Sequence, residues 1–252
     1  MNIFSSAEVS TTPSRFEAAQ SSLESGSPDG SPRAATIAKS KGVPLGEFRP
    51  TLLQRFGGLA LLAAPVLLTA GMLTSPEQAG PGTDAYIESL AADPALSLWS
   101  ANLLHYGWVA LALAAFAMLG LLRGARGRVF LPIAATILCI GAIQMSGLLL
   151  SDWFLVSAGN TLPLEDAVRM NEAALESSLE IWRMSGMIGG ILGIGLLSLA
   201  LARAKAISWW IAPLGFLPWV VPALGLGAIG ALIAFACYLP LLIAGGRLIA
   251  AR

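Results

Sequence analysis

Long runs of apolar residues alternate with short polar segments from Leu52 to the end of the chain. A hydrocarbon core of roughly 30 Å needs about 20 helical residues to cross it, and six runs approach that length. We therefore predict an all-α fold, a polytopic transmembrane helix bundle of six helices. The predicted spans cover residues 52–73, 100–122, 129–150, 183–202, 207–222 and 223–246.

The last two predicted spans share one uncharged stretch, residues 207–246. Pro213, Pro218 and Pro222 lie in its first half, and proline interrupts the hydrogen bonding of an α-helix. We therefore expect the turn between the two spans near Trp219 to Ala223. A re-entrant pair of helices is the alternative for this stretch.

The first part of the chain has a different composition. Residues 1–48 are rich in Ser, Thr, Ala and Pro and carry scattered charges of both signs. Such a stretch buries too little apolar surface to offset its chain entropy, so we predict a disordered cytoplasmic tail. The transmembrane helical domain then covers residues 49–252. The tail contains no apolar run typical of a signal peptide, and we expect the first span to stay in the mature protein.

The placement of charges predicts the orientation. Basic residues flank the ends of alternate spans, and acidic residues fill the two long loops between them. Cations collect in cytoplasmic loops, so this pattern places both chain ends in the cytoplasm. The expected inner cations are Arg49, Arg55, Arg123, Arg126, Arg128, Arg203, Lys205, Arg247 and Arg252.

Each long acidic loop is expected to carry a helix. In the first, Asp84 to Ala92 is a candidate short helix, with Pro94 just beyond it. In the second, Pro163 and the acidic residues after it are typical of a first helical turn. We expect that helix to run straight into the fourth span at Arg183.

The overall composition narrows the function. The chain has 15 basic and 15 acidic residues and is 56% hydrophobic. A chain with balanced charge lacks the basic surface that a nucleic-acid backbone requires, so we expect no nucleic-acid partner. The expected partner is the lipid bilayer. Cys139 and Cys237 lie in apolar runs, where cysteine is a small hydrophobic residue. Because there is one histidine and no metal-binding motif, we expect no cofactor and no metal.

A modest set of polar residues lies toward the outer ends of three predicted spans. Asn102 and His105 are three residues apart and so share one side of a helix. If the second, third and fourth spans are neighbours, these side chains converge in a small pocket that opens outward. The candidate ligand-binding residues are Asn102, His105, Gln144, Asp152 and Arg183.

The same residues also have a structural interpretation, which we favour. His105 would hydrogen-bond to Gln144 or to a neighbouring carbonyl, and Asp152 would pair with Arg183 and fix the order of the helices. The sequence has no phosphate-binding glycine loop, no nucleophile elbow and no Ser-His-Asp set with suitable spacing. We therefore assign no catalytic residue.

Three functions fit this chain. In the first, it is not an enzyme and acts by association with a membrane protein or as a homo-oligomer, as an accessory or regulatory subunit; the small-residue steps at Gly189 and Gly193 would let helices approach. The alternative is a carrier or binding protein for a lipid or small apolar solute, with an outward-facing pocket. The third is an enzyme for a lipid headgroup, with His105 as base and Asp152 as its orienting partner.

Several short motifs carry a resemblance. They are Leu104-His105-Tyr106-Gly107-Trp108 in the second span, Arg123-Gly-Ala-Arg126-Gly-Arg128 after it, Ser151-Asp152-Trp153-Phe154 at the end of the third and Trp209-Trp210 at the start of the fifth. Over about residues 50–250 the chain resembles uncharacterised multi-pass integral membrane proteins of high-GC bacteria, which are classed as domains of unknown function. The resemblance implies the cell (inner) membrane and no established activity.

Overall fold

The computed structural model describes residues 51–122 and 126–250, except for the side chain of Ser178. These two ranges are helical and contain no strand, as predicted; the tail predicted over residues 1–48 lies outside them. The α-helices are α1 (Leu52–Thr74), α2 (Thr83–Ala92), α3 (Pro94–Ala115), α4 (Phe130–Thr161), α5 (Leu164–Ala174), α6 (Glu180–Arg203), α7 (Gly227–Cys237) and α8 (Leu239–Ala250). Short 3-10 helices cover Ala117–Leu121, Ala212–Phe216 and Pro222–Leu224, and a π-helical turn covers Leu175–Leu179.

Three of these helices, α1, α4 and α6, are long and apolar enough to cross a membrane. The pair α7 and α8 is bent by 44° and makes a fourth only if the two form one span. α3 does not qualify although it has 22 residues, because polar Asn102 and His105 lie in its middle. The described chain thus has three helices of membrane-spanning character, or four with the bent pair; the prediction of six stays a prediction.

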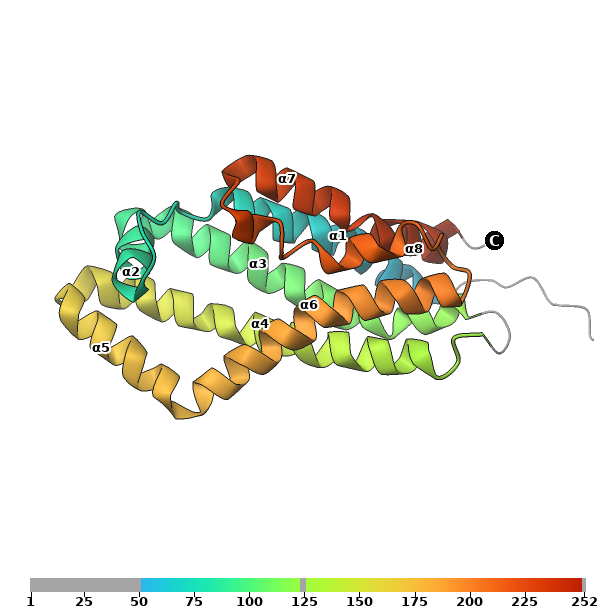
Figure 1. Ribbon diagram of the computed structural model, residues 1–252, viewed down its shortest axis with the longest axis horizontal. Coiled ribbons are helices and arrows are strands. Elements are labelled where there is room, and N and C mark those ends of the chain that lie inside the picture. Colours follow the sequence, from blue (N-terminus) through green and yellow to red (C-terminus); the bar gives the residue numbers. More distant parts are fainter. Residues whose placement is uncertain (1–50, 123–125, 251–252) are drawn as a thin grey trace, which may run out of the picture. The chain divides into compact units, whose positions relative to one another are not determined.

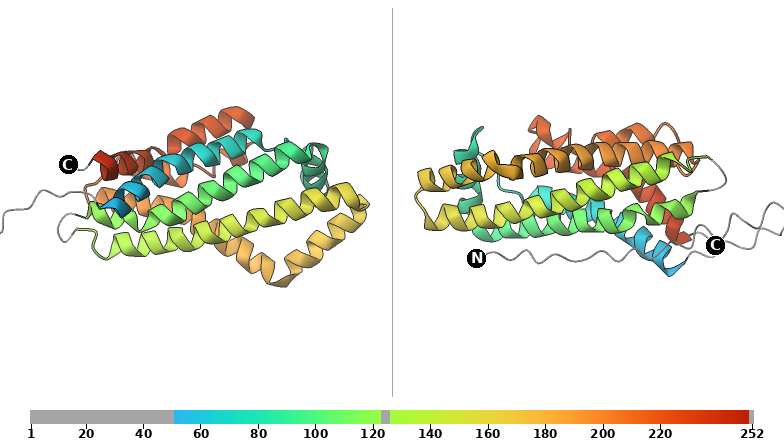
Figure 2. Two further views of the ribbon diagram at one scale, coloured as in Figure 1. Left: turned by 180° about the vertical axis from the view of Figure 1, so that it is seen from behind. Right: turned by 90° about the horizontal axis from the view of Figure 1, so that it is seen from below.

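Helices that follow each other along the chain pack side by side. α1 packs on α3, α3 on α4 and α4 on α6, while α7 and α8 lie along α1 (Figures 1 and 2). One buried apolar cluster runs through α1, α3, α4, α6 and α8 and includes Trp108 and Leu138. A smaller cluster, around Ile87 and Ala167, lies between α2, α5 and the end of α4.

The two ends of this helical unit carry opposite charge. At one end a Cβ built on Gly127 would lie 3.3 Å from Ala204, and Arg247 Nη1 donates to the Lys205 carbonyl at 3.5 Å. We call this the basic end. At the other end α2 contacts α4 and α5, and we call it the acidic end. Every acidic residue of the described ranges lies in the acidic half, from Glu77 to Asp93 and from Asp152 to Glu180.

α4 and α6 approach closely because glycines line both helices at their contact. A Cβ built on Gly141 would overlap the backbone of Gly189 and Gly190, and one built on Gly193 would lie 2.6 Å from Leu138 Cα. Small residues of this kind let two helix backbones pack directly against each other. The small-residue face of α6 is therefore occupied within the chain.

Residues 207–222 do not form the predicted α-helix. The chain there forms successive turns closed by hydrogen bonds between residues three apart, such as Leu217 N to Leu214 O at 3.0 Å. The three prolines of this segment cannot donate the bonds of an α-helix, and their rings clash with the preceding turn. The predicted turn between the fifth and sixth spans also comes later, at Gly225 and Gly227, whose φ values are 70° and 52°.

This 3-10 segment nevertheless runs antiparallel to α6 toward the acidic end. Phe216 packs on Gly195, and a Cβ built on Gly227 would lie 3.9 Å from Glu77 Oε1, just beyond α1. A 3-10 helix rises about 2.0 Å per residue against 1.5 Å in an α-helix, so it covers the distance in fewer residues. Its three-residue repeat also fits the burial of every third residue, namely Ala212, Gly215, Pro218 and Val221.

The two loop helices agree with the sequence, but their connection does not. α2 confirms the helix predicted from Asp84 to Ala92, and α5 begins directly after Pro163. The expected straight path from α5 into α6 is wrong, because Ser177 has φ −83° and ψ −165° and the chain bends sharply there (Figure 1). The Ser177 hydroxyl donates to the Ala174 carbonyl and thereby competes with helical hydrogen bonding.

The glycine contact between α4 and α6 predicts opposite effects for two alanine substitutions. Gly141→Ala places a methyl group against the α6 backbone and should lower the free energy of unfolding by about 1–3 kcal/mol. Gly246→Ala in α8 meets no atom within 4 Å and should be neutral or stabilising by up to about 1 kcal/mol. Thermal unfolding in detergent measures both. Equal midpoints for the two variants would contradict the contact.

Candidate functional site

His105 is held against α4 by Ser146. Its Nδ1 lies 3.1 Å from the Ser146 carbonyl oxygen and 3.0 Å from Ser146 Oγ. In one tautomer Nδ1–H donates to the carbonyl, and in the other the serine hydroxyl donates to Nδ1. The ring also lies 5.0 Å from Tyr106 and 6.0 Å from Trp153, measured between centroids. The predicted hydrogen bond between His105 and Gln144 is therefore wrong, and the predicted alternative, a bond to a neighbouring carbonyl, is confirmed.

Gln144 and Asn102 do not join His105. Gln144 packs against Gly186 of α6, and its buried Oε1 has no hydrogen-bond partner among the described residues. Asn102 Nδ2 donates to the Leu98 carbonyl of its own helix at 2.7 Å. Asn102 faces a hollow of about 480 Å³ that is lined by α3 alone, so this hollow lies on the outside of the helical unit.

Asp152 accepts a hydrogen bond from α2. The Tyr86 hydroxyl donates to Asp152 Oδ1 at 2.7 Å and so ties α2 to α4. Burial, together with the adjacent carboxylate, raises the pKa of Tyr86 above its ordinary value, which keeps the hydroxyl protonated and able to donate. This bond links the loop between α1 and α3 to the long helix α4.

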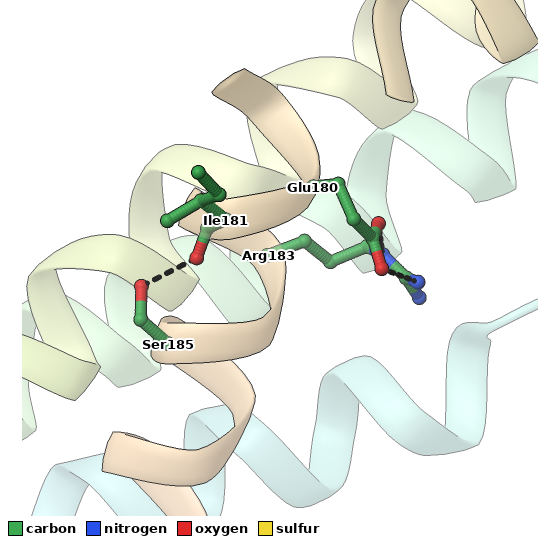
Figure 3. A network of polar contacts seen from close by, with 4 residues as sticks. All are labelled: Glu180, Ile181, Arg183 and Ser185. Carbon is green, nitrogen blue, oxygen red and sulfur yellow. Dashed lines mark hydrogen bonds and ion pairs between the residues drawn. The ribbon is translucent and has the colours of Figure 1, made fainter. Parts of the chain in front are cut away.

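Arg183 pairs with Glu180 and not with Asp152. Its Nε and one of its Nη atoms donate to the two carboxylate oxygens of Glu180, each at 2.7 Å (Figure 3). Residues three apart on a helix are neighbours, so Glu180 is the nearer acceptor. The predicted clamp between Asp152 and Arg183 is therefore wrong.

The five predicted residues thus do not form one pocket. In the described chain no hydrogen bond joins His105 to Asp152, although a catalytic base needs its orienting partner within about 2.6–3.2 Å. Within the same residues no group of three or more His, Cys, Asp and Glu side chains could hold a metal ion, and Cys139 and Cys237 are free thiols.

A cavity of about 450 Å³ opens farther toward the acidic end, between α4 and α5. α5 leaves the end of α4 at an angle and then bends into α6, so the three helices frame a triangle (Figure 1). A hydrogen bond ties α6 to α4, because Trp182 Nε1 donates to the Gln144 carbonyl at 2.8 Å. The apolar residues that line the cavity are Phe154, Leu155, Ala158, Leu162, Met170, Ala174 and Leu179.

Four polar residues also line this cavity, which we call the α4–α5 cavity. The Ser151 and Thr161 hydroxyls donate to carbonyls of α4 itself, at 2.6 and 2.8 Å. The side chains of Ser157 and Asn171 supply the remaining hydrogen-bonding groups. A mostly apolar cavity with a few polar groups, in the size range of about 300–1,000 Å³, is typical of a small-molecule site.

Sequence reasoning missed this cavity because it ended the third span at residue 150. α4 continues to Thr161, so the wall of the cavity lies beyond the predicted end. The apolar run Trp153 to Ala158 after Asp152 was a sign that the helix continues. Met170, Asn171 and Ala174 of α5 form the second wall, and their position against α4 has no comparable sign in the sequence.

The Tyr86–Asp152 bond predicts a difference between two tyrosine variants. Tyr86→Phe leaves the carboxylate without its donor and should lower the free energy of unfolding by about 1–3 kcal/mol. Tyr106→Phe is the matched control; its side chain is exposed, and we expect a change within about 0.5 kcal/mol. Chemical denaturation in mixed micelles measures the difference, and a Tyr86→Phe protein as stable as the control would exclude the bond as a tie between α2 and α4.

Comparison with known proteins gave no match: no protein-family model, no curated protein and no solved structure matches the chain. The resemblance to uncharacterised membrane proteins of high-GC bacteria therefore stays a prediction.

Proposed function

We propose that the chain is an integral protein of the cell membrane that binds a lipid or small apolar solute in the α4–α5 cavity. In this proposal the chain crosses the bilayer six times, with both ends in the cytoplasm and the acidic end outside. The α4–α5 cavity is the observation that carries the binding function. It would then open at the level of the outer headgroups.

The exposed surface of the helices supports a lipid environment. Large apolar side chains point away from the core in each long helix, for example Leu113 (71% exposed), Ile140 (54%) and Ile188 (52%). Soluble proteins seldom expose continuous apolar surface of this kind, because its contact with water is unfavourable. Hydrocarbon chains are a suitable solvent for it.

The segregation of charge supports the orientation. The exposed cations Arg126, Arg128, Arg203 and Arg247 lie at the basic end, opposite the acids of α2 and α5. Positive residues are retained on the cytoplasmic side during insertion, so the basic end is assigned to the cytoplasm. The segment from residue 207 to 226 then serves as the fifth crossing, and α7 with α8 as the sixth.

An irregular fifth crossing is compatible with a bilayer where protein covers it. Non-helical backbone at membrane depth is tolerated when it is buried against other segments. The 3-10 segment buries every third residue, and Gly215 lies so close to α6 that a Cβ there would meet the Ser198 side chain. α6 therefore supplies the cover that lipid cannot.

The cavity lining favours a ligand with an alkyl chain and a small polar group. Phe154 and Met170 are exposed at its edge, and Ala158 and Ala174 leave room between the two walls. Ser157 and Asn171 can donate to a carbonyl or hydroxyl oxygen of the ligand. A charged ligand would find no opposite charge among the lining residues.

Action by association, as an accessory or regulatory subunit, stays a second hypothesis. This hypothesis depended partly on a glycine-lined helix surface that a partner helix could contact. On α6 the glycines at 186, 190 and 193 instead contact Gln144, Trp108 and Leu138 of the same chain. The cavity therefore favours binding of a lipid or apolar solute over association.

An uncharged, photoactivatable analogue of hexadecanol tests the cavity. With the full-length protein in detergent, we expect crosslinks at residues 154–162 and 170–174, identified by peptide mass spectrometry. Ala174→Trp fills the cavity and should abolish these crosslinks, whereas the exposed neighbour Ala173→Trp should keep them. Crosslinks spread evenly over all apolar helices, or unchanged in Ala174→Trp, would refute the proposal.

Cysteine labelling tests the six crossings. In a chain with Cys139→Ala and Cys237→Ala, we expect a membrane-impermeant maleimide to label Glu88→Cys and Leu224→Cys from outside intact cells. Arg126→Cys and Ala250→Cys should react only after lysis. Protection of Leu224→Cys before lysis would mean that residues 207–226 do not cross, and labelling of Arg126→Cys from outside would reverse the orientation.

A further inference from the structure

Lys205 adopts a backbone conformation that usually belongs to glycine. Its φ is 61°, and it is the only non-glycine residue with positive φ in the described ranges. It stands at the end of α6, where Ala206 N bonds to Leu201 O at 2.8 Å and Lys205 N bonds to Ala202 O at 2.9 Å. This is the Schellman pattern, in which glycine is preferred at the position of Lys205 because a Cβ is strained there.

The Lys205 backbone lies beside other cationic residues. Arg247 Nη1 donates to the Lys205 carbonyl, and the turn containing Gly127 lies beside Ala204. That turn carries Arg126 and Arg128 on either side of the glycine. The exposed cations gathered at this end are Arg126, Arg128, Arg203, Lys205 and Arg247.

No acidic residue of the described chain balances this charge. The ion pairs found in those ranges, Arg169 with Asp166 and Arg183 with Glu180, both lie in the acidic half. Like charges held together repel one another, and a bound anion relieves the repulsion. The arrangement is therefore suited to a ligand of negative charge.

Two exposed indoles beside this cluster are typical of a membrane surface. Trp209 and Trp210 follow Lys205 closely and are 57% and 91% exposed. Tryptophan favours the headgroup region, where one edge of the ring is apolar and the other is wet. A lipid phosphate lies at the same depth.

We propose that Lys205, with Arg247 and the Arg126–Arg128 turn beside it, binds the phosphate of an anionic phospholipid. The assignment to the cytoplasmic leaflet rests on the proposed orientation, whereas the binding itself does not. Lysine offers a compact charge and arginine a planar pair of donors, and both suit a phosphodiester. Basic pockets between membrane helices on the cytoplasmic side recognise lipid headgroups in this way. The lysine at a glycine position retains its charge there at a cost in backbone strain.

Native mass spectrometry of the full-length protein, titrated with phosphatidylglycerol or with phosphatidylcholine of the same acyl chains, tests this site. We expect tighter binding of phosphatidylglycerol. Lys205→Gly should weaken that binding about fivefold, the factor expected for one cation at a membrane surface, and Arg247→Gln should act similarly. Because glycine relieves the strain, the thermal midpoint of Lys205→Gly should equal or exceed that of the unsubstituted protein.

Two substitutions serve as controls. Lys205→Arg keeps the charge and should keep the preference for phosphatidylglycerol. Arg169→Gln removes the same charge at the acidic end and should have no effect on it. Equal affinity for the two lipids, or equal weakening by Arg169→Gln and Lys205→Gly, would overturn the proposal. Displacement of phosphatidylglycerol by millimolar inorganic phosphate would assign the site to free phosphate and overturn it as well.

The same titration separates this site from the α4–α5 cavity. Ala174→Trp should bind phosphatidylglycerol as the unsubstituted protein does, since the cavity lies in the acidic half. If crosslinking at the cavity fails while the effect of Lys205→Gly persists, the phosphate site stands alone. If Lys205→Gly has no effect while Ala174→Trp abolishes crosslinking, the cavity stands and the phosphate site does not.

Discussion

The close contact between α4 and α6 determines where the other elements can lie. Because glycines face each other there, α6 sits directly on the backbone of α4, and Trp108 of α3 fits beneath Gly190. Toward the acidic end, α6 stays close enough to α4 for Trp182 to donate to the Gln144 carbonyl. Toward the basic end, Phe216 of the 3-10 segment packs on Gly195 of α6. A larger side chain at the contact would shift all three of these neighbours.

Much of the fold could be predicted from the sequence because its determinants are local. Membrane-length apolar runs gave α1, α4 and α6, and the short helices followed from Asp84 and Pro163. The prolines of residues 207–222 are also evident in the sequence, but they exclude the α-helix over the whole segment and not only at its turn. Three-residue periodicity in the burial of that segment depends on its contact with α6, and such tertiary contacts cannot be read from the composition of one segment.

The candidate site was harder to predict because it depends on partners distant in sequence. His105 was correctly placed at a helix contact, yet its partner is Ser146, and a serine within an apolar run is not distinctive. Asp152 accepts its hydrogen bond from Tyr86 of the loop helix α2, and Arg183 pairs with Glu180 instead. The α4–α5 cavity depends on how α5 lies against the end of α4, a tertiary contact between two helices. A charge-based reading identifies none of these choices.

The 3-10 segment has a consequence for how the protein is made. Ribosomes release the chain from its N-terminus, so in the proposed membrane arrangement α6 would leave the translocation channel before residues 207–226. The face of α6 that packs against the irregular backbone would therefore be in place when that backbone emerges. In the reverse order, the 3-10 turns of a fifth crossing would meet hydrocarbon before any protein covered them. If residues 207–226 cross the bilayer as proposed, the direction of synthesis gives this irregular backbone its protein cover before it meets lipid.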